Sequence, residues 1–532
     1  MSETDGPDGR YRTVGPGTPD PEGYFDDDDG TDEATRAERA AQDAEHDAGL
    51  RRVLASDLIA GPDPDVIEEV LGAPEVGVDE TAAATARAQA ETEVHRIYTE
   101  ILERAPEHDV QPSLERVQQV CELLGEPQRA YPVIHLTGTN GKTSTARVVE
   151  RLLREMGLRT GRFTSPHLST VRERIAIDGE PISPEAFVAT WADVEPYIAL
   201  VDERSREAGG PRLSFFEVFT VMALAAFADA PVDVAVIEVG MGGRWDATNV
   251  VDGLVEILTP ISRDHERWLG HELTSIAAEK VGIITPGSTV ISADQVEEVA
   301  GIVADAAHAL DARLVVEGAD LAVVDRQIAV GGQMLTLRTP SATYTDVFLP
   351  LHGEHQAHNA LLALAAAEVF FGGGSLDPGV VEQAMAAVDS PGRLELVRRS
   401  PSILVDAAHN PAGVEALRAA MEEAFDVART VGVVGIMADK DAETMLAGLE
   451  PLLAEIVITR ASTERAHDVE DLAEIARDVF GEDRVHVAER LDEAIDRAVT
   501  RAEADDDPRT SAVLVTGSIL VVAEARQLLG RP

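Results

Sequence analysis

Cysteine and long apolar segments are scarce in this chain of 532 residues. The single cysteine, Cys121, excludes an intrachain disulfide framework and a cysteine-ligated metal cluster, and it fits a reducing compartment. No apolar run approaches the roughly 18 residues that a membrane helix needs. The N-terminus also lacks the basic and apolar regions of a secretory signal. We therefore expect a soluble cytoplasmic protein with no membrane partner.

Positive charge is scarce as well, because 45 Lys and Arg face 96 Asp and Glu, for a formal net charge of −51. This balance disfavours nucleic acid as a partner bound through a general basic surface, although one charged ligand can still bind in a local site. Hydrophobic residues make up 44% of the chain, which supplies large cores and excludes wholesale disorder.

Lysine is the rarest basic residue, since Lys142, Lys280 and Lys440 are the only lysines and every other basic residue is arginine. A compact ammonium group differs from a planar guanidinium at a phosphate or in covalent chemistry. The three lysines are thus candidates for positions at which arginine cannot serve. The alternative is the chance survival of three lysines in an arginine-rich composition.

The first part of the chain is strongly acidic. Residues 1–50 hold 15 acidic and 4 basic residues, a net of −11, and offer too little apolar surface to offset the entropy of ordering. A helical stretch is predicted at 65–71, followed by an Ala/Thr-rich linker. We interpret residues 1–90 as an acidic, largely disordered extension.

Beyond this extension, strand and helix patterns alternate. Apolar strands are predicted at 132–136 and 232–239, and a second series of strands and helices begins near residue 391. The predicted fold is α/β, with a large parallel-sheet domain over residues 91–390, for which the glycine-rich motif at 138–144 predicts a P-loop-type ATPase. A smaller Rossmann-like α/β domain follows over residues 391–532.

The strongest local motif is Gly138-Thr139-Asn140-Gly141-Lys142-Thr143-Ser144, which lies between a predicted strand and an amphipathic helix at 145–156. Glycines let backbone N–H groups close around phosphate oxygens, and the helix N-terminus adds positive potential. Lys142 would reach the β- and γ-phosphates, and a hydroxyl of Thr143 or Ser144 would bind Mg²⁺. The loop departs from the general phosphate-loop pattern because Leu136 stands where a glycine is usual.

This shorter loop resembles the ATP-binding loop of the Mur ligase superfamily, and further motifs resemble the folylpolyglutamate synthase/dihydrofolate synthase family within it. The resemblance covers roughly residues 91–530. It is carried by Ser165-Pro166-His167-Leu168, Glu173-Arg174-Ile175, Ser214-Phe215-Phe216-Glu217, Glu238-Val239-Gly240-Met241-Gly242-Gly243-Arg244-Trp245-Asp246-Ala247-Thr248-Asn249, Asp264-His265, Glu279-Lys280-Val281-Gly282-Ile283, His355-Gln356 with Asn359-Ala360, Pro391-Gly392-Arg393, Asp406-Ala407-Ala408-His409-Asn410-Pro411 and Thr516-Gly517-Ser518.

The resemblance implies a metal ion, Mg²⁺, at the reacting carboxylate. Its ligands would be Ser165, Glu238 and His265, with the phosphate-loop hydroxyl already described. Carboxylate and hydroxyl oxygens suit Mg²⁺, whereas histidine is unusual for it. The family position of Lys280 is a carbamylated lysine that would support this metal site, and a plain lysine paired with Glu279 is the alternative. We therefore count Lys142, Lys280 and His265 as the candidate catalytic residues.

The resemblance also implies nucleotide and acceptor sites. The first group of residues matches family positions that contact ATP: the phosphate loop together with Asn359, Arg393, Asp406 and His409. The second group maps to positions that line the site of the pterin-containing substrate: Ser214, Phe216, Glu217, Trp245 and Asp246. An aromatic such as Phe216 is as readily explained as part of the core, so its contact with ligand stays open.

The predicted function is an ATP-dependent amide ligase that joins L-glutamate to dihydropteroate, to reduced folates, or to both, through an acyl phosphate. The alternatives are a cell-wall-precursor ligase of the same superfamily and a nucleotide-binding regulator without turnover. The expected partners are ATP, L-glutamate and the folate-type acceptor, and the protein is expected to be a monomer.

Two departures from the family pattern affect the site. Thr143 replaces the glycine that commonly follows the loop lysine, and charged Arg263, Glu266 and Arg267 surround His265. Neither departure removes a predicted ligand.

Overall fold

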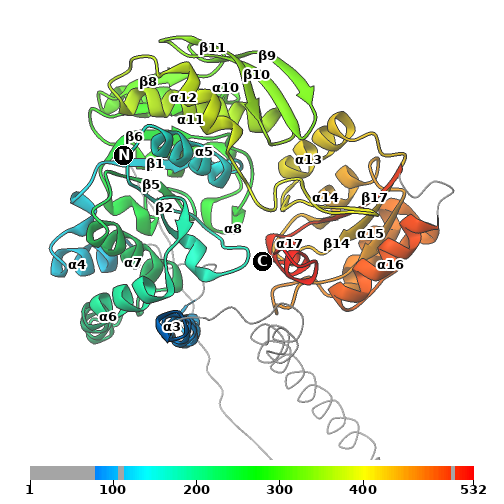
Figure 1. Ribbon diagram of the computed structural model, residues 1–532, viewed down its shortest axis with the longest axis horizontal. Helices are drawn as coiled ribbons and strands as arrows, with labels where there is room; N and C mark the ends of the chain where they lie inside the picture. Colours follow the sequence, from blue (N-terminus) through cyan, green and yellow to red (C-terminus); the bar gives the residue numbers. More distant parts are fainter. Residues whose placement is uncertain (1–77, 106–112, 505–509, 532) are drawn as a thin grey trace, which may run out of the picture. The chain divides into compact units, whose positions relative to one another are not determined.

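The computed structural model describes residues 78–105, 113–504 and 510–531 (Figure 1). Residues 83–532 form one compact unit that contains both α/β domains. The predicted helix at 65–71 lies outside the described residues. Within them, no helix has the length and apolar character required to span a membrane.

The larger domain is built on an eight-stranded sheet with the order β4-β3-β2-β5-β1-β6-β7-β8. Strands β2, β5, β1, β6, β7 and β8 run parallel, while β3 and β4 form an antiparallel edge. The strands are β1 (Val133–Thr137), β2 (Thr160–Phe163), β3 (Ile175–Ile177), β4 (Glu180–Pro181), β5 (Val234–Glu238), β6 (Gly253–Leu258), β7 (Thr289–Ser292) and β8 (Arg313–Val316).

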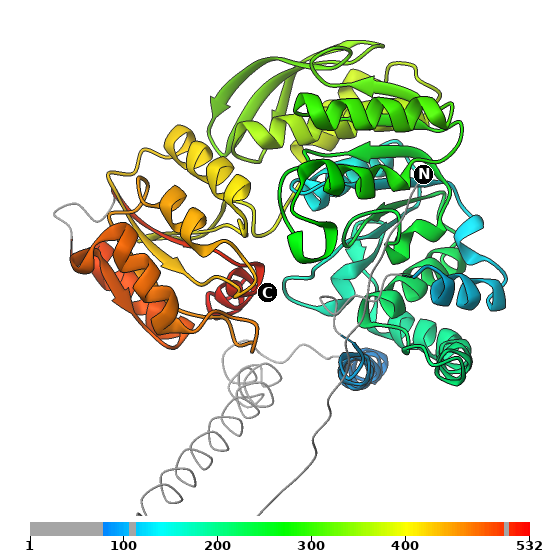
Figure 2. The same cartoon turned by 180° about the vertical axis from the view of Figure 1, so that it is seen from behind.

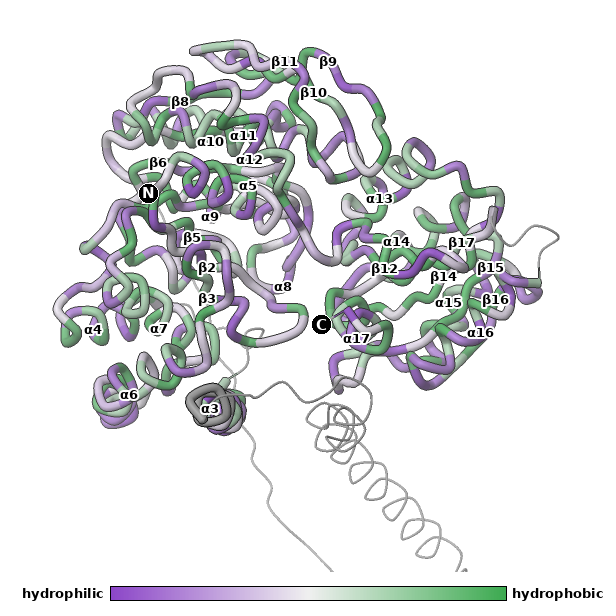
Figure 3. Tube along the Cα trace, viewed as in Figure 1, coloured by the Kyte–Doolittle hydropathy of each residue, from purple (hydrophilic) through white to green (hydrophobic). Residues whose placement is uncertain are grey.

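Helices cover both faces of this sheet, so its central strands are apolar on both sides. Ile134 and Leu136 of β1 pack with α5, α11 and α12, whereas Val133 packs with α4, α6 and α7 on the opposite face (Figure 1). Helix α7 is mostly apolar along its length (Figure 3). The helices are α3 (Val78–Leu102), α4 (Glu115–Leu123), α5 (Lys142–Glu155), α6 (Pro184–Glu207), α7 (Phe215–Asp229), α8 (Glu266–Leu269), α9 (Leu273–Lys280), α10 (Glu297–Ala309), α11 (Glu354–Phe370) and α12 (Pro378–Ala386).

A three-stranded antiparallel sheet, which was not predicted, follows β8. It consists of β9 (Ala322–Ala329), β10 (Gly332–Arg338) and β11 (Thr343–Leu349) in the order β11-β10-β9. Apolar residues of β10 and β11 join the same core as α5 and α11.

The smaller domain has a six-stranded sheet with the order β12-β13-β17-β14-β15-β16, parallel except at the β12 edge. Separate hydrophobic cores lie on its two faces, and Figure 2 shows its helices from behind. Its elements are β12 (Glu395–Arg399), β13 (Ser402–Val405), α13 (Pro411–Ala424), β14 (Arg429–Val434), α14 (Ala442–Leu449), β15 (Glu455–Ile458), α15 (Val469–Phe480), β16 (Val485–Val487), α16 (Leu491–Glu503), β17 (Ser511–Thr516) and α17 (Ile519–Leu528).

The predicted fold class is confirmed: a large parallel-sheet domain precedes a smaller α/β domain. The predicted boundary at residues 390 and 391 lies between α12 and β12. At the other end, α3 begins at Val78 and runs across the predicted limit at residue 90, so helical structure starts earlier than the sequence pattern indicated.

Candidate active site

A cleft with a volume of about 1900 Å³ lies at the carboxyl ends of strands from both domains. Open α/β sheets bind ligands at this edge because the loops after the parallel strands converge there. Almost every predicted site residue lines the cleft. The exceptions are Gly138, the first residue of the phosphate loop, and Lys280, whose Nζ donates to the Gly138 carbonyl oxygen.

The phosphate loop connects β1 to α5 and has two positions at which only glycine fits. Gly138 has φ +150°, and a Cβ there would lie 1.9 Å from the Thr259 Oγ1 atom. Gly141 has φ +89°, and its Cβ would lie 2.4 Å from Asn359 Oδ1. The loop backbone is therefore packed directly against Thr259, which follows β6, and against Asn359 of α11.

Two lysines meet at one backbone carbonyl of this loop. Lys142 Nζ donates to the carbonyl oxygens of Gly138 and Thr139, each at 3.1 Å, and Lys280 Nζ donates to the same Gly138 oxygen at 2.7 Å. Burial lowers the pKa of Lys142, and burial with the charge of Lys142 lowers the pKa of Lys280 to about 7.

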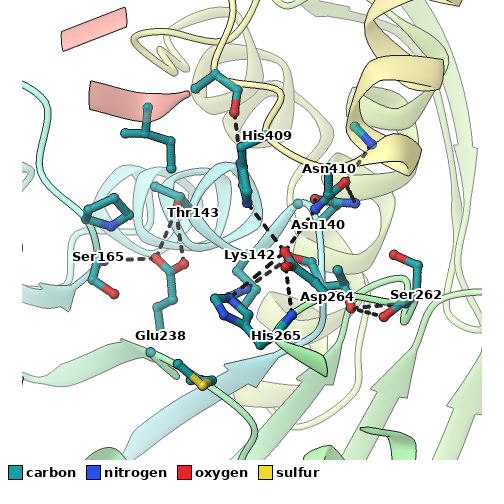
Figure 4. A pocket seen from close by; sticks show the side chains of 18 of the residues that line it. Asn140, Lys142, Thr143, Ser165, Glu238, Ser262, Asp264, His265, His409 and Asn410 are labelled. Atoms are coloured by element: carbon teal, nitrogen blue, oxygen red, sulfur yellow. Dashed lines mark hydrogen bonds and ion pairs between the residues drawn. The ribbon is translucent and has the colours of Figure 1, made fainter. Parts of the chain in front are cut away.

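Glu238, at the end of β5, is 1% exposed and faces the phosphate loop (Figure 4). The Thr143 hydroxyl donates to both Glu238 carboxylate oxygens at 3.0 and 2.9 Å, and the Ser165 amide lies 3.4 Å from one of them. Burial raises the pKa of Glu238 despite the nearby charge of Lys142. Ser144 points elsewhere, because its hydroxyl bonds Ser390 Oγ at 3.0 Å.

His265 lies in the loop after β6 with φ 53°, and its amide donates to Asp264 Oδ1 at 2.7 Å. Burial lowers the pKa of its imidazole to about 3, so the ring is neutral, as a metal ligand must be. Among the described residues, no group of three or more His, Cys, Asp or Glu side chains could hold a metal ion.

Asp264 links this loop to the smaller domain (Figure 4). Its carboxylate pairs with Lys440 Nζ and accepts a hydrogen bond from Asn410 Nδ2 at 3.1 Å, and His409 Nε2 lies 3.6 Å away. Burial acts to raise the pKa of Asp264, but His409, His265 and Lys440 outweigh burial and hold it well below its usual range.

The phosphate loop makes its own contact with the smaller domain. Asn140 and Asn410 exchange two side-chain hydrogen bonds of 3.1 and 3.0 Å. Asn410 is also the N-cap of α13, with its Oδ1 accepting from the Gly413 amide at 2.8 Å. One asparagine of the smaller domain therefore contacts the phosphate loop, Asp264 and its own helix.

The predicted nucleotide contacts lie on both sides of the cleft. Asn359 of α11 packs against Gly141 and donates to Gln356 Oε1 at 3.2 Å. Asp406 follows β13 and accepts from the amides of Leu394 and Ala408, each at 2.8 Å. His409 Nδ1 bonds the Ala407 carbonyl at 2.9 Å, and Arg393 lines the cleft next to β12.

Ser214 and Glu217, two of the predicted acceptor-site residues, form hydrogen bonds within the protein. The Ser214 hydroxyl accepts from the Glu217 amide at 3.3 Å, and Glu217 Oε2 accepts from the Ser214 amide at 2.7 Å, which forms a capping box at the start of α7. Glu217 Oε1 also pairs with Arg116 at 2.8 Å. Both side chains line the cleft, but their polar groups hold α7 in place.

The other three predicted acceptor residues form part of the wall. The Phe216 ring packs on Phe163 at 5.7 Å between centroids. The Trp245 amide donates to Glu279 Oε1 at 3.2 Å. Asp246 is 3% exposed, and burial raises its pKa to about 6.

Sequence reasoning missed several residues that line the cleft. Arg174 Nε donates to His167 Nδ1 at 2.9 Å, and its guanidinium lies 5.0 Å from the Phe215 ring centroid. Tyr98, on α3, packs edge-on against His167 at 5.9 Å. His167 and Arg174 stood in motifs that were recognised without a role, whereas Tyr98 stood in none. Lys440 was indicated by the scarcity of lysine and by its resemblance to a family loop that follows a strand, but it had no assigned role.

Comparisons with known proteins agree with this architecture. Residues 136–367 match the Mur ligase middle domain, and residues 392–519 match the glutamate ligase domain of Mur ligases. A dihydrofolate synthase/folylpolyglutamate synthase from Mycobacterium tuberculosis is 50% identical over 449 residues, covering 81% of this chain and 92% of that protein.

Solved structures give the same result. Mycobacterium tuberculosis folylpolyglutamate synthase complexed with ADP and AMPPCP has a TM-score of 0.80 and 48% identity, covering 83% of this chain and 99% of the other. Escherichia coli FolC in complex with DHPP and ADP has a TM-score of 0.68 and 30% identity, covering 79% and 94%. The chain belongs to the folylpolyglutamate synthase/dihydrofolate synthase family of ATP-dependent carboxylate–amine ligases.

Proposed function

We propose that this enzyme adds L-glutamate to both dihydropteroate and reduced folates. The observation that carries this proposal is the arrangement of one cleft, in which the phosphate loop and Glu238 lie beside a wall containing Phe216 and Asp246. The M. tuberculosis, Bacillus subtilis and E. coli relatives all carry both activities in their names, which supports the bifunctional assignment.

The reaction proceeds through an acyl phosphate. A carboxylate oxygen of the acceptor attacks the γ-phosphorus of ATP, and ADP leaves. The glutamate amine then attacks the activated carbonyl carbon, phosphate leaves, and the amine loses a proton as the amide forms. Lys142 and the N–H groups at the start of α5 stabilise the negative charge on the transferred phosphoryl group.

Mg²⁺ at this site would be held by Glu238, the Thr143 hydroxyl, Ser165 and His265. The buried Glu238 carboxylate and the Thr143 hydroxyl, whose single proton is shared between the two carboxylate oxygens, offer oxygen ligands that fit a hard cation. The engagement of Ser144 with Ser390 favours Thr143 over Ser144 as the hydroxyl ligand. When bound, the ion would neutralise charge on the phosphoryl oxygens and the reacting carboxylate.

Lys280 is the residue we assign to carbamylation. Two ammonium groups on the Gly138 carbonyl repel each other, and a pKa of about 7 leaves a substantial fraction of Lys280 as the neutral amine. The ammonium group first loses one proton, and the neutral amine then attacks CO₂ and loses a second proton, so that a buried cation becomes a carbamate anion. Intact-mass measurement with labelled bicarbonate should detect one added CO₂ in the wild type and none in Lys280→Arg. An unmodified wild type would contradict the assignment.

The other residues that line the cleft are assigned to the nucleotide or to the acceptor. Asn359, Arg393, Asp406 and His409 contact the nucleotide, which lies between a domain of residues 91–390 and one of residues 391–532. Phe216, Trp245 and Asp246 contact the acceptor, while Ser214 and Glu217 act by holding α7. We further propose a monomer that does not bind nucleic acid, consistent with its net charge of −51.

The test is phosphate release with ATP, Mg²⁺ and L-glutamate, measured separately with dihydropteroate, a reduced folate and a UDP-linked muramyl acceptor. Release with the first two acceptors supports the proposal. Release with reduced folate alone makes the enzyme a polyglutamate synthase. Release with the muramyl acceptor alone contradicts the proposed acceptor class, and release with none of them under any condition supports a non-catalytic regulator. The Lys142→Ala variant gives the background rate.

A further inference from the structure

A buried polar chain leads from the centre of the large sheet to the acceptor side of the cleft. His135 of β1 and Thr248 of the short helix at Ala247–Val250 are both 0% exposed. His135 Nε2 lies 2.9 Å from Thr248 Oγ1, and Thr248 Oγ1 lies 2.6 Å from Asp246 Oδ1. The chain ends at Asp246, which lines the cleft.

The direction of the hydrogen bonds in this chain follows from the partners of Asp246. Its Oδ1 also accepts from the Thr248 amide at 3.0 Å, and its Oδ2 accepts from the Met241 amide at 2.9 Å. Backbone donors on both oxygens favour the ionised carboxylate. An ionised Asp246 must receive the hydroxyl proton of Thr248, so Thr248 Oγ1 accepts from His135 and Nε2 carries the ring proton.

The other end of the chain supports the same direction. Burial lowers the pKa of His135 to about 3, so the ring is neutral and carries one proton. The Nδ1 atom of His135 is buried and has no hydrogen-bond partner among the described residues. With the proton on Nε2, Nδ1 is an unpaired acceptor; with the proton on Nδ1, it would be an unpaired donor in a dry core, which is the rarer situation.

We propose that His135 and Thr248 are positioning residues for acceptor binding: their hydrogen-bond chain holds the Asp246 carboxylate ionised and oriented toward the cleft. This inference rests on the proposed function in one respect, namely that the ligand facing Asp246 is the pterin-containing acceptor. An ionised carboxylate there accepts hydrogen bonds from N–H groups of the heterocycle, whereas a protonated one loses part of that capacity.

Substitutions at Thr248 and His135 leave the other charged groups around Asp246 unchanged. Lys142 of α5 and Lys280 of α9 both act electrostatically on Asp246. Helices α4 and α7 pack against the helix that holds Thr248 and bring Arg116 and Glu217, which pair with each other. A change in the titration of Asp246 therefore reports on Thr248 and His135.

The kinetic test compares Thr248→Val, which replaces the hydroxyl by a methyl group, with Thr248→Ser, which keeps it. In Thr248→Val the KM for the acceptor should rise about tenfold or more, as expected for one lost charge-assisted hydrogen bond. The acidic limb of kcat/KM should move to higher pH, because loss of a donor raises the pKa of Asp246 above about 6. The KM for ATP should stay constant, and Thr248→Ser should restore both values.

His135 gives a second pair of variants. His135→Leu removes the donor and should reproduce the effects of Thr248→Val. In His135→Gln an amide donor stands close to the position of Nε2, so this variant should restore acceptor binding. If Thr248→Val and His135→Leu both keep the wild-type acceptor KM and pH profile, the proposal is wrong.

A measurement without substrate separates this inference from the proposed function. Nitrogen NMR of ¹⁵N-histidine-labelled full-length protein, with His135→Gln for assignment, should show a neutral His135 ring protonated at Nε2. A ring protonated at Nδ1 would overturn the chain, whatever the acceptor. A wild type that is inactive on every folate acceptor but has the Nε2–H ring would overturn the proposed function and leave the chain standing.

Discussion

The two α/β domains share an architecture and differ in what their loops contribute. Each places polar residues after the carboxyl ends of parallel strands. In the larger domain these residues are the phosphate loop, Glu238 and His265, which line the cleft. In the smaller domain they are Asn410 and Lys440, whose side chains end on Asp264 and Asn140 of the larger domain.

The larger domain supplies the phosphate loop, and the smaller domain supplies side chains that complete the cleft. Similar sheets do not imply similar roles, because the function resides in the loop residues. Variants in the larger domain should therefore lower kcat strongly, whereas variants in the smaller domain should act mainly on nucleotide affinity and on the stability of the closed cleft.

The largest effect is expected for Lys142→Ala. Loss of the ammonium group removes charge stabilisation during phosphoryl transfer, and kcat should fall about 100- to 1000-fold, as for other donors to a transition-state oxyanion. Among residues 78–105, 113–504 and 510–531, Lys142 hydrogen-bonds only carbonyls of its own loop, so the melting temperature should change little. Near-normal turnover at saturating ATP would show that the loop does not act on phosphate.

The next largest effect is expected for Glu238→Gln. The amide keeps the size of the side chain and an acceptor for Thr143, but it removes the charge that would hold the cation. The concentration of Mg²⁺ needed for half-maximal activity should rise about 10- to 100-fold, and high Mg²⁺ should restore part of kcat. An unchanged Mg²⁺ titration would return Glu238 to a purely structural role.

The phosphate loop and Glu238 could be predicted from the sequence because each belongs to a local pattern. The phosphate loop is encoded in seven consecutive residues, so its position between β1 and α5 was predictable. Glu238 was predictable because it ends an apolar strand, and alternating strands and helices sufficed for the fold class.

Contacts between distant segments were not predictable in the same way. Asp264 and Lys440 are 176 positions apart, and neither the loop after β6 nor the loop after β14 indicates its partner. The sheet of β9, β10 and β11 was missed because its strands carry exposed polar residues and lie between two helical segments. Ser214 and Glu217 were assigned to substrate, although their spacing is also that of a capping box.

A smaller effect is expected for Lys440→Met, which tests the contribution of the smaller domain. Removal of one partner leaves Asp264 buried without its cation, at a cost of about 3 kcal/mol. The kcat/KM for ATP should fall about tenfold. The double variant Asp264→Asn/Lys440→Met leaves no unpaired charge, so its melting temperature should recover relative to the single variant.

The pH dependence of this stability has a defined sign. The pKa of Asp264 is lowered by folding, so its contribution is fully present above the unfolded value of about 4 and is lost as the pH falls below it. The difference in melting temperature between wild type and Lys440→Met should be largest near neutral pH and shrink on acidification. A constant difference would contradict the assigned ion pair.

The smallest effect is expected for deletion of residues 1–77, which precede α3. The residues that line the cleft all lie between positions 98 and 520 of the chain. The KM for ATP, the KM for the acceptor and kcat should therefore stay within about twofold of the wild type, a change worth less than about 0.5 kcal/mol. A larger loss would assign the acidic segment a role in catalysis.

The central claim is that the larger domain activates the acceptor as an acyl phosphate, and an isotope transfer experiment tests it most directly. An acceptor whose reacting carboxylate carries heavy-isotope oxygen is turned over with ATP, Mg²⁺ and L-glutamate, and the released phosphate is examined by mass spectrometry. Because the carboxylate oxygen attacks phosphorus and later leaves with it, the account predicts one heavy oxygen in each phosphate released. Unlabelled phosphate together with labelled amide product would contradict it.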